Sequence, residues 1–109
     1  MDTPAMNHLI ERIKTHDFQK SDFKLFDFDT VLTILVFQGL KMCLPELKAW
    51  VKLGFSAIAT QRLALEKKLK DYALEKELDY QQAEQVAEAI AQNINEENLG
   101  SIIQELEAK

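Results

Sequence analysis

The chain has few of the residues that mark disulfide-rich, disordered or fibrous proteins. Among its 109 residues there are one cysteine, two prolines and three glycines. The single Cys43 excludes an internal disulfide, and with no secretory leader in the sequence it predicts a reducing, cytoplasmic location. An apolar share of 47% is not typical of disorder or low complexity. The sequence therefore predicts one folded domain over residues 1–109.

A long hydrophobic run is also missing. The most apolar stretch, residues 31–44, is interrupted by Thr33, Gln38 and Lys41. A membrane-spanning helix needs about 20 consecutive apolar residues, so this stretch is too short and too polar. We expect no membrane association.

Basic residues are almost absent from the C-terminal third. The whole chain has a net charge of −5, but residues 77–109 hold eight acids against Lys109 alone, a net of −7. Such a segment repels nucleic acid and anionic lipid and attracts a basic partner. The alternative is a solvated acidic face that only keeps the protein soluble.

The basic residues that remain do not form an uninterrupted surface. The best candidate for a nucleic-acid face comprises Arg62, Lys67, Lys68, Lys70 and Lys76. Three acids, Glu66, Asp71 and Glu75, are interleaved with them, and mixed charge of this kind is typical of an exposed helix face. We therefore predict no nucleic-acid binding.

Apolar residues at helical spacing predict helices throughout the N-terminal two-thirds. The first helix has Asp2 or Thr3 as its cap and Pro4 in its first turn. Residues 31–44 are rich in β-branched residues, but their length and context favour a helix over a strand. A pattern from Pro45 to Leu78 follows, which as one helix would span about 45–50 Å. Either it breaks near Gly54, or it projects and pairs with another chain.

Two further helices are predicted at the C-terminus. Asp79, with Gln82 three residues later, has the spacing of a capping box. Asn95 is expected to cap a last helix with Glu96 and Glu97 in its first turn, where the helix dipole favours acids. The predicted fold is a single all-α domain, an irregular or orthogonal bundle of four to six helices.

A phenylalanine-rich stretch, "DFQKSDFKLFDFD", occupies residues 17–29. Its rings are Phe18, Phe23, Phe26 and Phe28. Their spacing matches neither a helix nor a strand, which favours a buried aromatic joint between two helices. An exposed acidic and aromatic docking motif remains the alternative, and it requires the rings to be solvent-exposed together.

Catalytic and metal-binding patterns are missing. His8 and His16 lack the spacing of a metal site, and Cys43 lies in an apolar context without a nucleophile motif. The three glycines are isolated, so none belongs to a phosphate-binding loop. We predict a protein that is not an enzyme and that needs no metal or cofactor.

The acids of the C-terminal third are the most suggestive feature. Glu84 and Glu88 lie four residues apart, where like charges weaken a helix. With Glu96 and Glu97 they form the predicted binding surface of a non-enzymatic protein–protein interaction module, such as an inhibitor, antitoxin or immunity protein that neutralises a basic partner.

Two other functions remain open at the level of the sequence. A homo-oligomer could form through the long helix of residues 45–78 and through exposed rings in residues 17–28. A carrier of a small apolar ligand could have a pocket between helices, lined by Phe26, Phe28, Phe37 and Phe55.

Overall fold

The helices expected from the apolar periodicity are present in the computed structural model. It describes residues 3–15, 28–54, 58–76 and 78–108, without the side chains of 28–31 and 58–59. In these ranges the chain forms six helices and no strand. They are α1 (Pro4–Lys14), α2 (Phe28–Met42), α3 (Leu44–Leu53), α4 (Ile58–Glu75), α5 (Tyr80–Gln92) and α6 (Glu96–Glu107). The all-α prediction is confirmed. The segment 31–44 is helical up to Met42, where α2 ends, and Leu44 begins α3.

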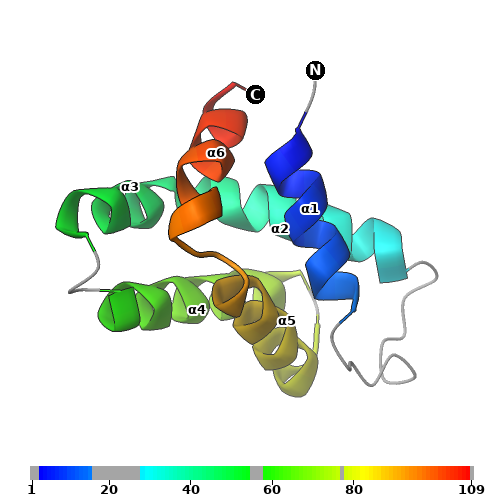
Figure 1. Cartoon of the computed structure of the whole chain (residues 1–109). Helices are drawn as coiled ribbons and strands as arrows, with labels where there is room; N and C mark the ends of the chain where they lie inside the picture. Colours follow the sequence, from blue (N-terminus) through cyan, green and yellow to red (C-terminus); the bar gives the residue numbers. More distant parts are fainter. Residues whose placement is uncertain (1–2, 16–27, 55–57, 77, 109) are drawn as a thin grey trace.

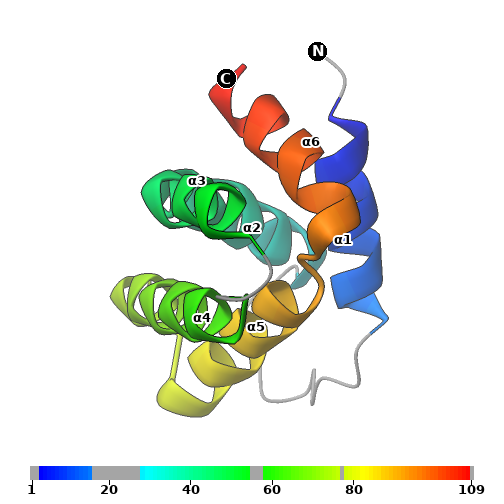
Figure 2. The same ribbon diagram turned by 60° about the vertical axis from the view of Figure 1, so that its left-hand side comes forward.

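The helices cross one another as an irregular bundle. α2 and α3 follow each other in one layer, α4 runs beneath them, and α5 packs against α4 (Figure 1). α1 and α6 lie side by side and cross α2 steeply, so the two ends of the chain lie on the same side of the molecule (Figure 2). None of the helices in the described ranges is long and apolar enough to cross a bilayer.

The core lies where these layers meet. Its members are the apolar residues that recur at helical spacing, and the largest fully buried side chains among them are Met6, Leu9, Ile13, Leu32, Val36, Leu40, Leu47, Leu65, Ile90, Ile94, Ile102 and Leu106. Alanines at positions 83, 87, 89 and 91 of α5 are buried too. Their small side chains let α5 approach its neighbours closely.

The long apolar pattern of residues 45–78 breaks at Gly54. This residue ends α3 with φ 69° and ψ −160°, a conformation that is essentially restricted to glycine. α4 then returns beside α3, and the Lys68 ammonium lies 2.9 Å from the Glu46 carboxylate across the pair. The prediction of a break is confirmed, and none of the helices in the described ranges projects in the way that the alternative required.

The caps predicted for the last two helices are present. Asp79 and Gln82 form a capping box at α5, and Asn95, with Asn98, forms one at α6. Of the two caps predicted for α1, Thr3 occupies the N-cap position but makes no side-chain hydrogen bond there, and Asp2 lies outside the described residues. The carboxylate of Glu105 on α6 accepts the free N–H groups there instead.

Two helical glycines differ in what surrounds them, and this predicts opposite outcomes for alanine. A Cβ at Gly100 in α6 would meet no atom within 4 Å, whereas one at Gly39 in α2 would lie 3.0 Å from Leu69 Cδ2 and 3.4 Å from Tyr72 Cδ1. We expect Gly100→Ala to raise the free energy of unfolding by about 0.5–1 kcal/mol, the gain in helix propensity.

At Gly39 the same gain is offset by crowding, which costs about 1–3 kcal/mol in a packed core. Gly39→Ala should therefore be neutral or destabilising. Urea denaturation of both variants beside the parent checks this. Equal stabilisation by the two substitutions would contradict the close packing of α4 on Gly39.

Candidate functional site

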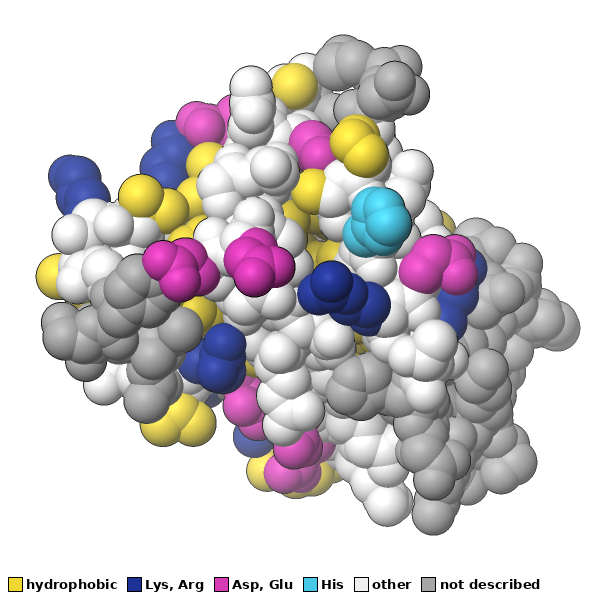
Figure 3. Space-filling model, viewed as in Figure 1, with side chains coloured by type: hydrophobic (Ala, Val, Ile, Leu, Met, Phe, Trp, Pro, Cys, Tyr) yellow, Lys and Arg dark blue, Asp and Glu magenta, His cyan; other side chains and the backbone are white. Residues whose placement is uncertain are grey.

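The four glutamates predicted to bind a partner are all exposed. Glu84 and Glu88 lie on α5, and Glu96 and Glu97 form the first turn of α6. No ion pair joins any of the four to a lysine or arginine within the described ranges. Figure 3 shows that acidic side chains on this face occur in several places, with basic side chains between them.

Other acids of the same segment have structural roles. The Asp79 carboxylate accepts the N–H of Gln82 at 2.8 Å in the capping box of α5. Glu105 caps α1, and Glu107 forms an ion pair with Lys48 of α3 at 2.7 Å. Glu77 lies outside the described residues. The four predicted glutamates are therefore the described acids of this segment that no such contact occupies, apart from a hydrogen bond from Gln92 to Glu88.

A fifth acid, Glu66 of α4, joins part of this surface. Partial burial raises its pKa, and repulsion from Glu88 and Glu84 raises it further, while Lys70 opposes the change. The packing of α5 on α4 thus brings Glu66, Glu84 and Glu88 together. Glu96 and Glu97 are not among the groups that act on Glu66. Sequence reasoning missed Glu66 because lysines surround it along α4.

This repulsion makes a prediction about pH. We expect Glu88→Gln to lower the pKa of Glu66, because it removes the larger of the two repulsions. A carboxyl with a raised pKa binds its proton more tightly in the folded chain, so its contribution to stability falls as pH rises through its unfolded and then its folded pKa.

NMR titration of the Glu66 carboxyl in the parent and in Glu88→Gln measures this effect. Glu75→Gln, also on α4, is the control, because Glu75 does not act on Glu66. An unchanged pKa of Glu66 in Glu88→Gln would show that the two carboxylates do not interact.

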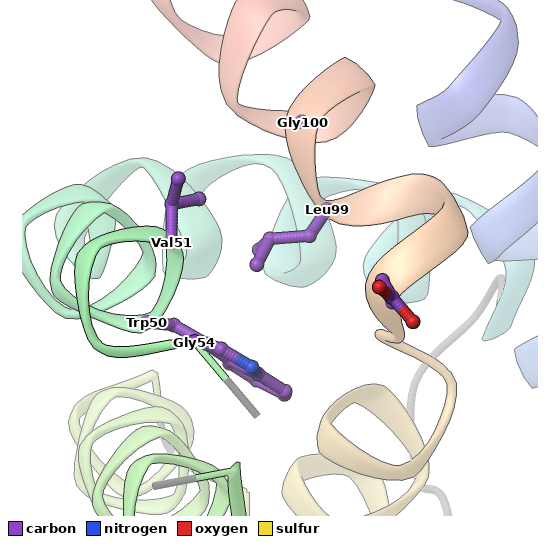
Figure 4. Close-up of a pocket in the computed structure, with 6 residues that line it drawn as sticks. Trp50, Val51, Gly54, Leu99 and Gly100 are labelled. Atoms are coloured by element: carbon purple, nitrogen blue, oxygen red, sulfur yellow. The ribbon is translucent and has the colours of Figure 1, made fainter. Parts of the chain in front are cut away.

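A pocket lies between α3 and the start of α6. It has a volume of about 310 Å³ and is lined by Trp50, Val51, Gly54, Glu96, Leu99 and Gly100. Val51 and Leu99 face the space from opposite sides, with the Trp50 ring below them (Figure 4). Trp50 is buried, whereas Val51 is 56% exposed. The walls are apolar, and Glu96 supplies one carboxylate.

Arg62 holds one side of this pocket in place. Its guanidinium lies 5.4 Å from the centre of the Trp50 ring and donates to the carbonyl oxygens of Ala91, at 3.1 Å, and Ile94, at 2.9 Å. Those carbonyls belong to the end of α5 and the residues after it, where the helix dipole favours a cation. Arg62 thereby connects α3, α4 and α5. The sequence placed this residue on a basic surface and gave no sign of these contacts.

The other residues of the candidate basic face mostly contact groups of the protein. Lys68 pairs with Glu46, Lys70 donates to the hydroxyl of Tyr80 at 3.1 Å, and Lys76 lies 5.5 Å from the Tyr72 ring. Lys67 is exposed. These contacts reduce the positive charge that the face can offer to a phosphate backbone.

Cys43 is buried at the junction of α2 and α3, with 1% of its surface exposed. Burial raises the pKa of its thiol to about 11, with Glu46 adding to the effect and Lys68 opposing it. Because the thiolate is the reactive form, we expect no reaction of native Cys43 with a disulfide reagent at about pH 8.

Labelling should appear only when urea unfolds the chain and restores an ordinary thiol pKa of about 8.5. Absorbance of the released thiolate of the reagent measures both states. Rapid labelling of the folded protein would contradict the burial of Cys43.

Two other sets of predicted residues lie largely outside the described part of the chain. Phe18, Phe23 and Phe26 fall in residues 16–27, and the side chain of Phe28 is also not described. Of the rings predicted to line a carrier pocket, Phe37 is the one described. It packs against the core and borders a hollow of about 210 Å³ with Gln38, Lys41 and Leu106.

Metal-binding groups do not gather in the described ranges. No group of three or more histidine, cysteine, aspartate or glutamate side chains that could hold a metal ion occurs there. His8 is exposed and borders a polar hollow between α1 and α6, with Arg12 and Glu97 nearby, and His16 lies outside the described residues.

No protein-family model, curated protein or solved structure matches this chain. Its function is therefore argued from its own residues alone.

Proposed function

We propose that the protein is a non-enzymatic interaction module that binds a basic protein through the exposed carboxylates of α5 and the first turn of α6. The surface comprises Glu84, Glu88, Glu96 and Glu97. One observation carries the proposal: the structure uses Asp79, Glu105 and Glu107 for caps and an ion pair, and leaves these four facing solvent. A basic partner would relieve the repulsion at Glu84 and Glu88.

The repulsion can be measured through the pKa of Glu66, because the nearby Glu88 and Glu84 carboxylates raise it. Carboxylates that disfavour one another's charge are stabilised when cations approach them. Complementary charge also accelerates encounter between proteins, by an amount that falls with ionic strength. A cytoplasmic inhibitor, antitoxin or immunity protein that covers the positive site of a basic toxin or nuclease would use both effects.

Neutralising the surface tests this proposal. Affinity capture from the native host with mass spectrometry identifies the partner, and binding kinetics then compare the parent with a variant carrying Glu84→Gln, Glu88→Gln, Glu96→Gln and Glu97→Gln. We expect the association rate to drop at least tenfold in the variant, and to fall with salt in the parent. Asp71→Asn with Glu75→Gln removes two exposed acids of α4 and serves as the control.

Three results would count against the proposal. One is a stoichiometric partner that is acidic, and another is an association rate that the four substitutions leave unchanged. The third is capture of the chain alone, with light scattering that shows a dimer at every concentration. That result would favour the homo-oligomer instead. The break at Gly54 removes the single long helix that was one basis of this alternative, and the side chains of its other basis, the rings of residues 17–28, lie outside the described part of the chain.

A further inference from the structure

We propose that the pocket between α3 and α6 receives an apolar side chain of the basic partner, with a neighbouring lysine or arginine of that partner on Glu96. The inference deepens the proposed function and rests on it, because it assumes a basic protein as the occupant. It concerns a different part of the surface from Glu84 and Glu88, so the two can fail separately.

The pocket has the size and chemistry of a site for an anchor residue. Its volume of about 310 Å³ is at the lower end of the range for ligand pockets. Trp50 and Leu99 supply apolar walls, and Val51 is 56% exposed at this site. Buried anchors in pockets of this kind, ringed by polar groups, provide most of the binding energy in many protein interfaces.

The glycine at position 100 suggests contact with another molecule, because packing within the described chain does not explain it. It lies inside α6, where glycine weakens a helix, and φ is not positive there. A Cβ would meet no atom within 4 Å, so nothing within the described chain requires glycine at this position. A bare backbone on the wall of a pocket allows another chain to approach closely. Glycine at this position lowers the stability of α6 but leaves its backbone accessible to a partner.

The negative charge of Glu96 and Glu97 beside the pocket favours an occupant that carries positive charge. Glu96 lines the pocket, and Glu97 follows it in the same first turn of α6. Both are exposed and have no ion pair in the described ranges, whereas Arg62, which lies over the Trp50 ring, already donates to the carbonyls of Ala91 and Ile94. An apolar segment without positive charge would bury or crowd Glu96 without compensation. The occupant is therefore apolar at its tip and basic beside it.

The Trp50 ring at the pocket is held in place by Arg62, and its fluorescence can report binding. Arg62 fixes the Trp50 ring from the side of α4 and α5, so the pocket is preformed. Trp50 is the only tryptophan in the chain. A side chain that enters the pocket changes the surroundings of this ring, and a change in tryptophan emission will report it.

Peptide selection supplies a defined probe before the partner is known. A phage-displayed library of random peptides without tryptophan is selected on the parent, and the enriched peptides are synthesised and titrated while Trp50 emission is recorded. We expect enriched sequences to combine a large apolar residue with adjacent lysine or arginine. Gly100→Leu, which adds a large side chain to a residue that lines the pocket, should weaken their binding at least tenfold, and Glu96→Gln about threefold.

Ser101→Leu is the matched control. It adds the same side chain to the next residue of α6, which borders the hollow facing α1 and not this pocket. Binding to this variant should equal that of the parent. Gly100→Leu should melt no lower than the parent, because the space at Gly100 is open and leucine favours a helix. Loss of binding with retained stability therefore means a filled pocket.

The outcomes separate the two proposals. Basic peptides that bind Gly100→Leu as well as the parent, but lose affinity for Glu84→Gln with Glu88→Gln, would overturn the pocket and leave the proposed function standing. Enriched peptides without basic residues would overturn the basic occupant of this pocket, while the captured partner would still decide the proposed function. Enrichment of no peptide at all would overturn the pocket as a peptide site, while the captured partner would still decide the function.

Discussion

Glu105→Ala is expected to lower the free energy of unfolding by about 2–3 kcal/mol. The two carboxylate oxygens of Glu105 accept the backbone N–H groups of Ala5, at 2.8 Å, and Met6, at 2.9 Å. Pro4 has no N–H, and the helical ladder begins with Asn7 donating to Thr3. Glu105 therefore satisfies both remaining donors in the first turn of α1, and its loss leaves two partly buried N–H groups without an acceptor.

Thermal and urea denaturation measure the effect, with Gln104→Ala as the control. Gln104 is exposed and precedes Glu105, so this control makes the same change in helix propensity without removing the cap. Glu105→Gln should fall between the two, because its side chain keeps one acceptor oxygen. For a domain of this size each kcal/mol corresponds to about 4–8 °C in Tm. Equal stability of Glu105→Ala and Gln104→Ala would show that the terminal helices are held together by apolar packing alone.

Contacts between near neighbours in the sequence could be predicted, and the structure shows why. The capping pairs Asp79–Gln82 and Asn95–Asn98 each lie within one helical turn. The break at Gly54 likewise depends on one residue, because few others adopt its φ. These features need no knowledge of how the helices pack. A bundle of four to six helices was predicted from such short-range patterns, and the described ranges contain six.

Contacts between distant residues could not be predicted in this way. Glu105 reaches α1 across about a hundred positions, and Glu66 meets Glu84 and Glu88 only because α5 packs on α4. In the sequence Glu105 was one acid among eight, and Glu66 was an interruption in a basic run. The same limit applies to the pocket. Trp50 lies in the apolar pattern of residues 45–78 and Leu99 in the last predicted helix, and nothing in the sequence indicates that the two face a common space.

Arg62→Met is expected to lower the free energy of unfolding by about 2–4 kcal/mol. The sequence places Arg62 on a basic surface, whereas in the structure it connects three helices. The guanidinium donates to the carbonyls of Ala91 and Ile94, and hydrogen bonds from charged donors contribute about 1.5–3 kcal/mol each. Methionine keeps apolar contact with Trp50 but offers no donor. Lys67→Met, on the exposed side of α4, is the control and should change stability by less than about 0.5 kcal/mol.

Arg62→Lys distinguishes the geometry of the guanidinium from its charge. Lysine keeps the positive charge near the end of α5 but cannot donate in a planar fork to two carbonyls while lying over a ring, so it should recover only part of the loss. Urea denaturation with Trp50 emission as the probe follows all three variants. If Arg62→Met were as stable as Lys67→Met, Arg62 would be the surface cation that its neighbours in the sequence suggest. The pocket would then have no fixed wall, and its proposed role as a preformed site for an anchor residue would lose its support.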